Sequence, residues 1–213
     1  HGKMSELIKN LNNLRNSEIK NKVNSRLQEF KNFKNKNNEE WFSELCFCIL
    51  TSNSKARTAI AIQNELKEKD FINKSEKEIR DVIFKHKHRF HNNKAKYIVE
   101  ARKYLDIKDR INNLIQEKGI IETREYLVKN IKGLGYKEAS HFLRNVGYDE
   151  IAILDRHIVN LLIENNYLDK KFKTFNKKNY LEAEKIYLDF SNQVKMKPAE
   201  LDLYMWYIKG GDV

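Results

Sequence analysis

The chain has 213 residues and a mass of 25.5 kDa, which fits one domain or two small lobes. Hydrophobic residues make up 40% of the chain, enough to form a buried core, and this excludes a fully disordered protein. The chain carries 41 Lys and Arg residues against 30 Asp and Glu residues, a net charge of +11. Such a basic charge favours a polyanionic partner, nucleic acid before an acidic membrane surface, with lysine-aided solubility as the alternative.

The first structural signal is a scarcity of helix breakers, with one proline and seven glycines in the whole chain. Apolar residues recur every three to four positions over 19–30, and a broad apolar face over 41–50 predicts a central helix. Residues 75–78 have the pattern of a capping box. Further helical periods lie at about 94–105, 107–118, 122–131, 137–146, 156–167, 177–194 and 199–208, with solvated loops expected at 31–38 and 170–179.

No segment alternates like a half-buried strand, so the sequence predicts an all-α fold of about ten or more helices. We expect two helical lobes with a cleft between them, within a single unit over 1–213. One lobe is a helical barrel over 39–150 that includes a hairpin at 126–146, and the other is a terminal lobe of 1–38 plus 151–213.

The two cysteines, Cys46 and Cys48, are too few for a four-cysteine zinc or iron–sulfur site. They are expected to be reduced, buried thiols of a cytoplasmic protein. His86, His88 and His91 lie close together in the sequence, but no acidic partner lies nearby, so we expect no metal site. No run approaches 18 apolar residues, so no membrane span is expected.

Two glycines, Gly133 and Gly135, lie between two amphipathic segments and form a helix-hairpin-helix pattern. Both glycines are expected to allow backbone conformations and close approaches that larger residues prevent, with Leu134 packed between the helices. The turn would present backbone N–H groups at the start of the second helix, where they suit a phosphate oxygen. Lys132 adds attraction to a nucleic-acid backbone. The alternative is an ordinary corner between two helices.

Lys137 lies in the first turn of the second hairpin helix, where the positive end of the helix disfavours the ammonium form. A neutral amine there would be a nucleophile, and the alternative is a surface lysine that contacts phosphate. Asp155 follows an apolar run and precedes a helix, so it has the pattern of an N-cap. A capping aspartate is held rigidly and could also stabilise positive charge that develops on a sugar.

These residues resemble the helix-hairpin-helix DNA glycosylase superfamily. The resemblance rests on Gly-Leu-Gly-Tyr-Lys-Glu-Ala at 133–139 and Leu-Asp-Arg-His-Ile at 154–158. Within the superfamily the chain is most similar to the archaeal-type 8-oxoguanine DNA glycosylase/AP lyases. That likeness extends to Glu-Trp-Phe at 40–42, Leu-Cys-Phe-Cys-Ile-Leu-Thr at 45–51, His-Arg-Phe at 88–90 and Glu-Leu-Asp-Leu-Tyr-Met-Trp-Tyr at 200–207.

The resemblance implies an enzyme that excises 8-oxoguanine from duplex DNA. It implies that the Lys137 amine attacks C1′, that Asp155 orients the amine and stabilises the sugar cation, and that a Schiff base then allows β-elimination 3′ to the lesion. We expect a nucleoid-associated monomer that needs no cofactor and has no iron–sulfur cluster, although a monovalent cation could bind at the hairpin. The alternatives are a non-catalytic DNA-binding module, or a glycosylase of the same class for another oxidised base.

Further DNA contacts are expected in a basic turn before a helix, from Arg89, Phe90 and Lys94. Phe90 could enter the base stack or pack on the extruded base, and the alternative is a hydrophobic staple on the next helix. By resemblance, Asn53 fills the gap opposite the unpaired partner base, and its alternative is a helix C-cap.

Asp202 and Trp206 are four residues apart and share a face of the last helix. A carboxylate can accept both donors of the guanine Watson–Crick edge, and an indole can stack on the purine. The pair therefore favours base recognition, with solvation of Asp202 and core packing of Trp206 as the alternative.

Overall fold

The computed structural model describes residues 5–213, and within that range it contains twelve α-helices and two short 3-10 segments but no strand. The all-α prediction is confirmed. The helices are α1 (Glu6–Arg15), α2 (Ile19–Phe33), α3 (Asn38–Thr51), α4 (Ala56–Glu65), α5 (Glu68–Asn73), α6 (Glu76–Lys85), α7 (His91–Ala101), α8 (Ile107–Asn130), α9 (Tyr136–Asn145), α10 (Arg156–Glu164), α11 (Lys177–Gln193) and α12 (Pro198–Ile208), with 3-10 segments at Arg102–Tyr104 and Lys170–Lys173.

The chain forms two compact units. The central unit is Asn35–Val146, and the terminal unit joins the described residues up to Lys34 with Gly147–Val213. The chain passes between the units at 34/35 and 146/147, whereas the sequence placed these boundaries at 38/39 and 150/151. The first boundary therefore lies just before α3, and the second lies just after α9.

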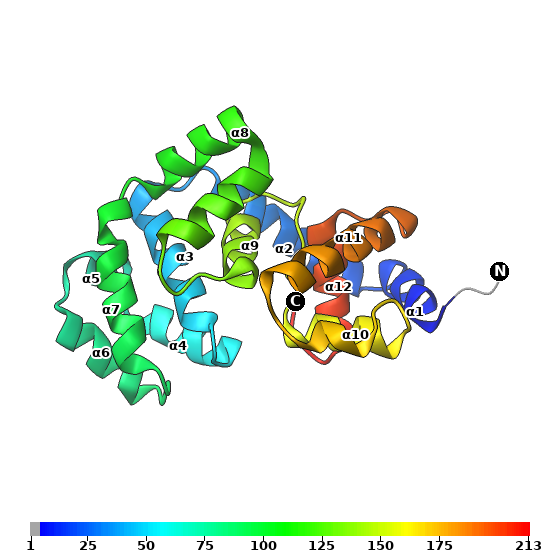
Figure 1. Cartoon of the computed structure of the whole chain (residues 1–213), viewed down its shortest axis with the longest axis horizontal. Coiled ribbons are helices and arrows are strands. Elements are labelled where there is room, and N and C mark those ends of the chain that lie inside the picture. The colour runs from blue at the N-terminus through cyan, green and yellow to red at the C-terminus, as the bar shows by residue number, and fades with distance from the viewer. Residues whose placement is uncertain (1–4) are drawn as a thin grey trace. The chain divides into compact units, whose positions relative to one another are not determined.

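Helix α3 forms the core of the central unit, and α4, α5, α7, α8 and α9 pack against it (Figure 1). Every residue of α3 from Trp41 to Thr51 is buried except Glu44. The two free thiols, Cys46 and Cys48, lie on this helix, and burial raises the pKa of both well above the ordinary value. The predicted central helix and the predicted buried thiols are both confirmed.

Helix α8 is interrupted at Gly119, whose backbone has φ 85° and ψ 173°. Essentially only glycine adopts this conformation, so the sequence break between two predicted helical periods has a direct backbone cause. The second half of α8 contacts α9, and these two helices form the predicted hairpin.

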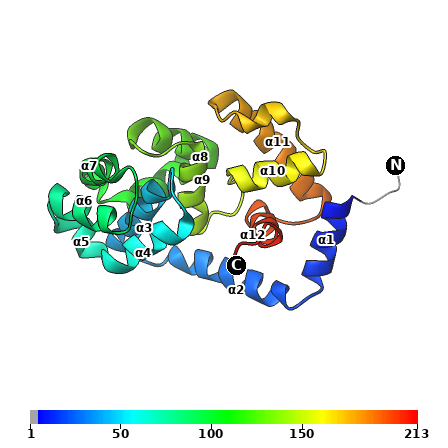
Figure 2. The same cartoon turned by 90° about the horizontal axis from the view of Figure 1, so that it is seen from below.

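Helix α12 has the corresponding role in the terminal unit, where it contacts α1, α2, α10 and α11 (Figure 2). Pro198 begins this helix at a position where the missing N–H costs nothing. The Tyr187 hydroxyl donates to the Pro198 carbonyl at 2.7 Å and joins α11 to the start of α12.

The predicted loops at 31–38 and 170–179 are too long. Helix α2 continues to Phe33 and α3 already begins at Asn38, while a 3-10 turn and the first turn of α11 occupy most of the second segment. Lysine and asparagine are tolerated on the exposed face of a helix whose opposite face is buried, as Val23 and Phe30 are in α2. No helix in the described part of the chain combines the length and apolar character that a membrane span requires.

Candidate functional site

The hairpin joins α8 to α9 through a tight turn in which Ile131 and Leu134 are buried. Gly133 has φ 91°, and a Cβ atom there would lie 2.8 Å from Tyr97 Cδ2 and 3.2 Å from Ile49 Cγ2. Glycine is therefore required at 133 both by backbone conformation and by space. The predicted backbone conformation and close packing of Gly133 and the predicted burial of Leu134 are confirmed.

Gly135 differs from the prediction. Its φ of −89° is open to any residue, and an added Cβ would meet only the flexible end of Glu138, with Oε1 at 2.9 Å. Its N–H donates to Glu138 Oε1 at 2.9 Å, which makes a capping box at the start of α9. One donor of the expected phosphate cradle is therefore already occupied by a carboxylate of the protein. Lys132, in the same turn, is exposed as expected of a phosphate contact.

Lys137 lies in the first turn of α9, and its Nζ is 3.1 Å from Glu138 Oε2. The Lys137 side chain is 28% exposed and that of Glu138 is 11% exposed. The amine therefore lies at the start of the helix, in contact with a mostly buried carboxylate.

Lys94 does not lie on the basic surface where the sequence placed it. It is 3% exposed, on the face of α7 that also buries Ala95 and Ile98. Burial lowers the pKa of Lys94, while the negative charge of Glu138 raises it and the positive charge of Lys137 lowers it. Lys94 thus belongs to a small group of charges around Lys137, because its position on the helix turns it toward the core.

Two turns that carry predicted DNA contacts are joined by His88, which is 2% exposed. His88 Nε2 lies 3.0 Å from the carbonyl oxygen of Leu50, at the end of α3, and therefore donates to it. The N–H of Phe90 donates to His88 Nδ1 at 3.1 Å, just before α7. These two bonds assign a neutral ring with its proton on Nε2, and burial lowers the pKa of His88.

The residues carried by these turns are exposed. Asn53 has φ 60° and follows Ser52, which is the C-cap of α3, so Asn53 is not the cap itself. Phe90 is 36% exposed, which argues against a buried staple, and the Arg89 guanidinium lies over its ring with the Cζ atom 5.3 Å from the centroid.

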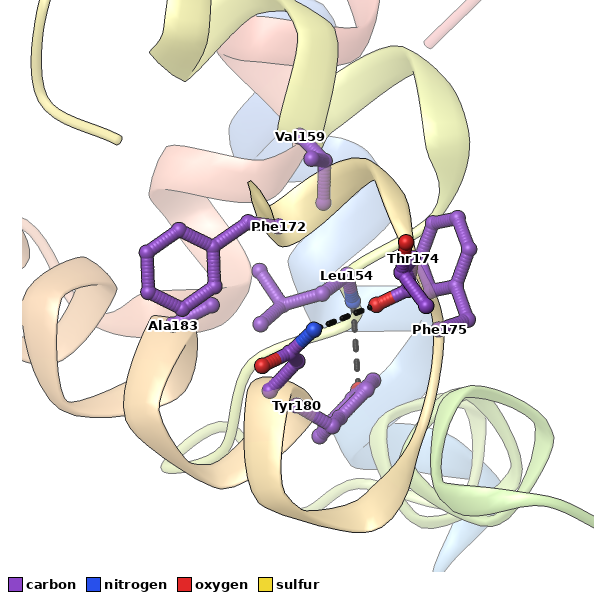
Figure 3. Close-up of a pocket in the computed structure, with 8 residues that line it drawn as sticks. Leu154, Val159, Phe172, Thr174, Phe175, Tyr180 and Ala183 are labelled. Atoms are coloured by element: carbon purple, nitrogen blue, oxygen red, sulfur yellow. Dashed lines mark hydrogen bonds between the residues drawn. The ribbon is translucent and has the colours of Figure 1, made fainter. Parts of the chain in front are cut away.

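Asp155 is the N-cap of α10, in the terminal unit, and its Oδ1 accepts the Ile158 N–H at 2.8 Å. The capping prediction is confirmed. The preceding segment is held by Tyr180, whose hydroxyl accepts the Leu154 N–H at 3.1 Å and donates to the Ala152 carbonyl at 2.7 Å. Figure 3 shows Leu154 and Tyr180 at a small apolar pocket beside this segment. Hydrogen bonds thus hold both the Asp155 side chain and the backbone that precedes it.

Asp202 and Trp206 both lie on α12. Asp202 is buried, so the alternative of a solvated carboxylate is wrong. Trp206 is partly exposed, and its ring makes an edge contact with His157 of α10 at a centroid distance of 5.3 Å. The C-terminal segment returns to this residue, since the Gly211 N–H donates to the Trp206 carbonyl at 2.9 Å. A Cβ atom at Gly211 would overlap the indole, so the tail lies directly on Trp206.

The candidate residues therefore divide between the units. Lys137, the hairpin, Asn53, Arg89, Phe90 and Lys94 belong to the central unit, and Asp155, Asp202 and Trp206 belong to the terminal unit. Sequence reasoning missed the contacts of Glu138 and His88. A glutamate three residues after a helix-starting glycine is a capping signal that could have indicated Glu138, whereas nothing local indicates the partners of His88.

Comparison with known proteins decides the family. The model of the family described as 8-oxoguanine DNA glycosylase matches residues 23–196. The chain belongs to the 8-oxoguanine DNA glycosylase family. The matched range contains Lys137 and Asp155, while Asp202 and Trp206 lie beyond it.

Relatives in the 8-oxoguanine DNA glycosylase family cover nearly the whole chain. The 8-oxoguanine DNA glycosylase/AP lyase of Methanocaldococcus jannaschii is 52% identical, over 97% of this chain and 98% of its own length. The protein of the same name from Thermoplasma volcanium is 44% identical, over 90% of each. The resemblance seen in the sequence is confirmed.

Solved structures of the 8-oxoguanine DNA glycosylase family have the same fold. The Methanocaldococcus jannaschii 8-oxoguanine glycosylase/lyase in complex with a 15mer DNA containing 8-oxoguanine matches with a TM-score of 0.92 at 50% identity, over 97% of this chain and 98% of that chain. The 8-oxoguanine DNA glycosylase of Thermotoga maritima matches with a TM-score of 0.88 at 37% identity, over 98% of both. Among residues 5–213 of the present protein, no three His, Cys, Asp or Glu side chains gather so that they could hold a metal ion.

Proposed function

We propose that this protein removes 8-oxoguanine from duplex DNA and then cuts the strand 3′ to the resulting abasic site. The observation that carries the proposal is Lys137, an amine held at the mouth of the hairpin helix by Glu138. It occurs in a chain that matches relatives named 8-oxoguanine DNA glycosylase/AP lyase over nearly its full length.

In this proposal the neutral Lys137 amine attacks C1′ of the damaged nucleotide. A bond forms between Nζ and C1′, the bond from C1′ to the base breaks, and its electron pair leaves with the base, which takes up a proton. The sugar ring opens to a Schiff base on Nζ. Loss of a C2′ proton then expels the 3′ phosphate, which cuts the strand. The route needs no cofactor.

The remaining candidate residues have separate roles. The Asp155 carboxylate stabilises positive charge on the sugar, and its capping bond to Ile158 holds it in one orientation. Asp202 accepts the donors of the guanine Watson–Crick edge, while Trp206 and Phe90 offer faces for the extruded base. The burial of Asp202 supports this role, because hydrogen bonds to a carboxylate that is shielded from water are stronger and leave a larger penalty when a donor is missing.

The duplex would be held mainly through its phosphates. The exposed cations Lys132 and Arg89 supply attraction that depends on salt but not on sequence. Asn53, in its exposed left-handed turn, would fill the space left by the extruded base. We propose that the protein acts on the chromosome as a monomer.

Borohydride trapping on a duplex with one 8-oxoguanine tests the proposal, because borohydride reduces the Schiff base to a stable cross-link. We expect the native protein and the exposed-lysine control Lys118→Gln to give the adduct and the cut strand, and Lys137→Gln to give neither while it still binds the duplex. An adduct that persists in Lys137→Gln would place the nucleophile elsewhere. Binding without adduct or cleavage by the native protein would indicate a DNA-binding module. A panel of duplexes with oxidised pyrimidines separates the other lesion classes.

A further inference from the structure

We infer that Glu138 is a positioning residue that ties the Lys137 amine to the turn of the hairpin. The inference rests on the proposed function, since it concerns the nucleophile of that reaction. Its basis is a single carboxylate with two partners: Oε1 accepts the Gly135 N–H at 2.9 Å, and Oε2 lies 3.1 Å from Lys137 Nζ.

The geometry of α9 makes this arrangement specific. Adjacent residues on a helix point about 100° apart, so a lysine and a following glutamate do not meet by default. Here Glu138, the third residue of the helix, reaches back to the Gly135 N–H, which brings its carboxylate over the start of the helix. The Lys137 side chain comes from the same turn and meets it there.

The surroundings favour a lasting contact. The Glu138 side chain is nearly buried, so solvent screens its charge less than it screens a surface pair. The buried Lys94 lies close enough to sense both charges, since Glu138 raises its pKa and Lys137 lowers it. One carboxylate thus lies near two lysines.

The carboxylate restricts the flexible four-carbon side chain of Lys137 to one region beside the hairpin. Loss of the charge should therefore misplace the amine. A displacement of about 1 Å can cost roughly 100-fold in rate, so a tenfold effect is a modest expectation for this contact.

The test compares Glu138→Gln with Glu78→Gln. Glu78 caps α6 in the same way, because its Oε1 accepts the Ser75 N–H at 3.1 Å while its Oε2 lies 3.8 Å from Lys74 Nζ. Both Gln variants keep an acceptor for the cap and lose the charge beside a lysine. The measurement is the single-turnover rate of borohydride trapping at saturating protein, followed as a function of pH, with duplex affinity and thermal unfolding measured on each variant.

We expect Glu138→Gln to bind the duplex within about twofold of the native affinity and to react about tenfold more slowly on the high-pH plateau, in keeping with the displacement argument. Glu78→Gln should change neither the affinity nor the plateau rate. Glu138→Asp keeps the negative charge. An aspartate can make this cap, since Asp70, the third residue of α5, accepts the Lys67 N–H in the equivalent way. Glu138→Asp should therefore recover at least half of the native rate.

The inference is overturned if Glu138→Gln and Glu78→Gln share the native plateau rate. If Glu138→Gln does not fold, Glu138→Asp decides, and a rate at or below one tenth of native contradicts the role of the charge. These outcomes differ from failure of the proposed function, in which the native protein itself forms no adduct.

Discussion

Substitution of Gly133 by alanine tests whether the hairpin turn depends on that glycine for the reasons the structure gives. At φ 91° an L-residue costs about 1 to 2 kcal/mol relative to glycine. The new Cβ would also lie 2.8 Å from Tyr97 Cδ2 and 3.2 Å from Ile49 Cγ2. Overpacking of this kind typically costs about 1 to 3 kcal/mol.

The reduced freedom of alanine in the unfolded chain offsets about 0.4 to 1 kcal/mol of these costs. We therefore expect Gly133→Ala to lower the free energy of unfolding by about 2 to 4 kcal/mol. For a chain of this length 1 kcal/mol corresponds to about 2 to 4 °C, so Tm should fall by roughly 5 to 15 °C. Urea titration and thermal unfolding measure both quantities.

Gly135→Ala is the matched control, two residues away in the same turn. Its φ of −89° brings no strain, and its Cβ meets only the Glu138 Oε1, at the end of a flexible side chain. We expect it to cost at most about 1 kcal/mol, the usual effect of alanine at an N-cap. A loss of less than about 1 kcal/mol in Gly133→Ala, or a loss of more than about 1 kcal/mol in Gly135→Ala, would contradict this explanation of the turn.

Three further outcomes follow from the structure. Asp155→Asn should keep the cap of α10 and the stability, whereas Asp155→Ala should lose about 1 kcal/mol in urea unfolding, and both should abolish base release if the carboxylate acts in the reaction. Burial lowers the pKa of His88, so the native ring stays neutral while the unfolded ring is protonated below about pH 6.5. Stability should therefore fall as the pH drops from 7.5 to 5.5, and less steeply in His88→Gln; equal slopes would contradict the assignment. Asp202→Ala should slow release of 8-oxoguanine at least tenfold, since a buried acceptor is lost, and a native rate would exclude Asp202 from the base pocket.

The Gly135 N–H already donates to Glu138, so the hairpin turn offers a phosphate fewer N–H groups than the sequence predicts. A capping carboxylate and a phosphate oxygen both accept hydrogen bonds from the backbone N–H groups at the start of a helix. In this protein Glu138 holds one of them through Oε1, so a bound phosphate would rely on other N–H groups of the turn and on Lys132.

The features that could be predicted from the sequence depend on residues close together along the chain. Helix periods follow from apolar spacing. The capping box of residues 75–78 and the cap by Asp155 involve groups three residues apart. Gly133 lies in a turn whose backbone conformation other residues rarely adopt. These hydrogen bonds and backbone preferences are local, so their patterns can be read without knowledge of the fold.

The burial of particular side chains and the contacts between distant groups depend on the fold, and the sequence does not reveal them. Lys94 and Asp202 are buried because helices from other parts of the chain cover them, although both residue types are usually exposed. His88 links turns 38 residues apart, and Gly133 is crowded by Tyr97 and Ile49 from other helices. Packing between segments that are far apart in the sequence leaves no local pattern, and for that reason these contacts could be found only in the folded chain.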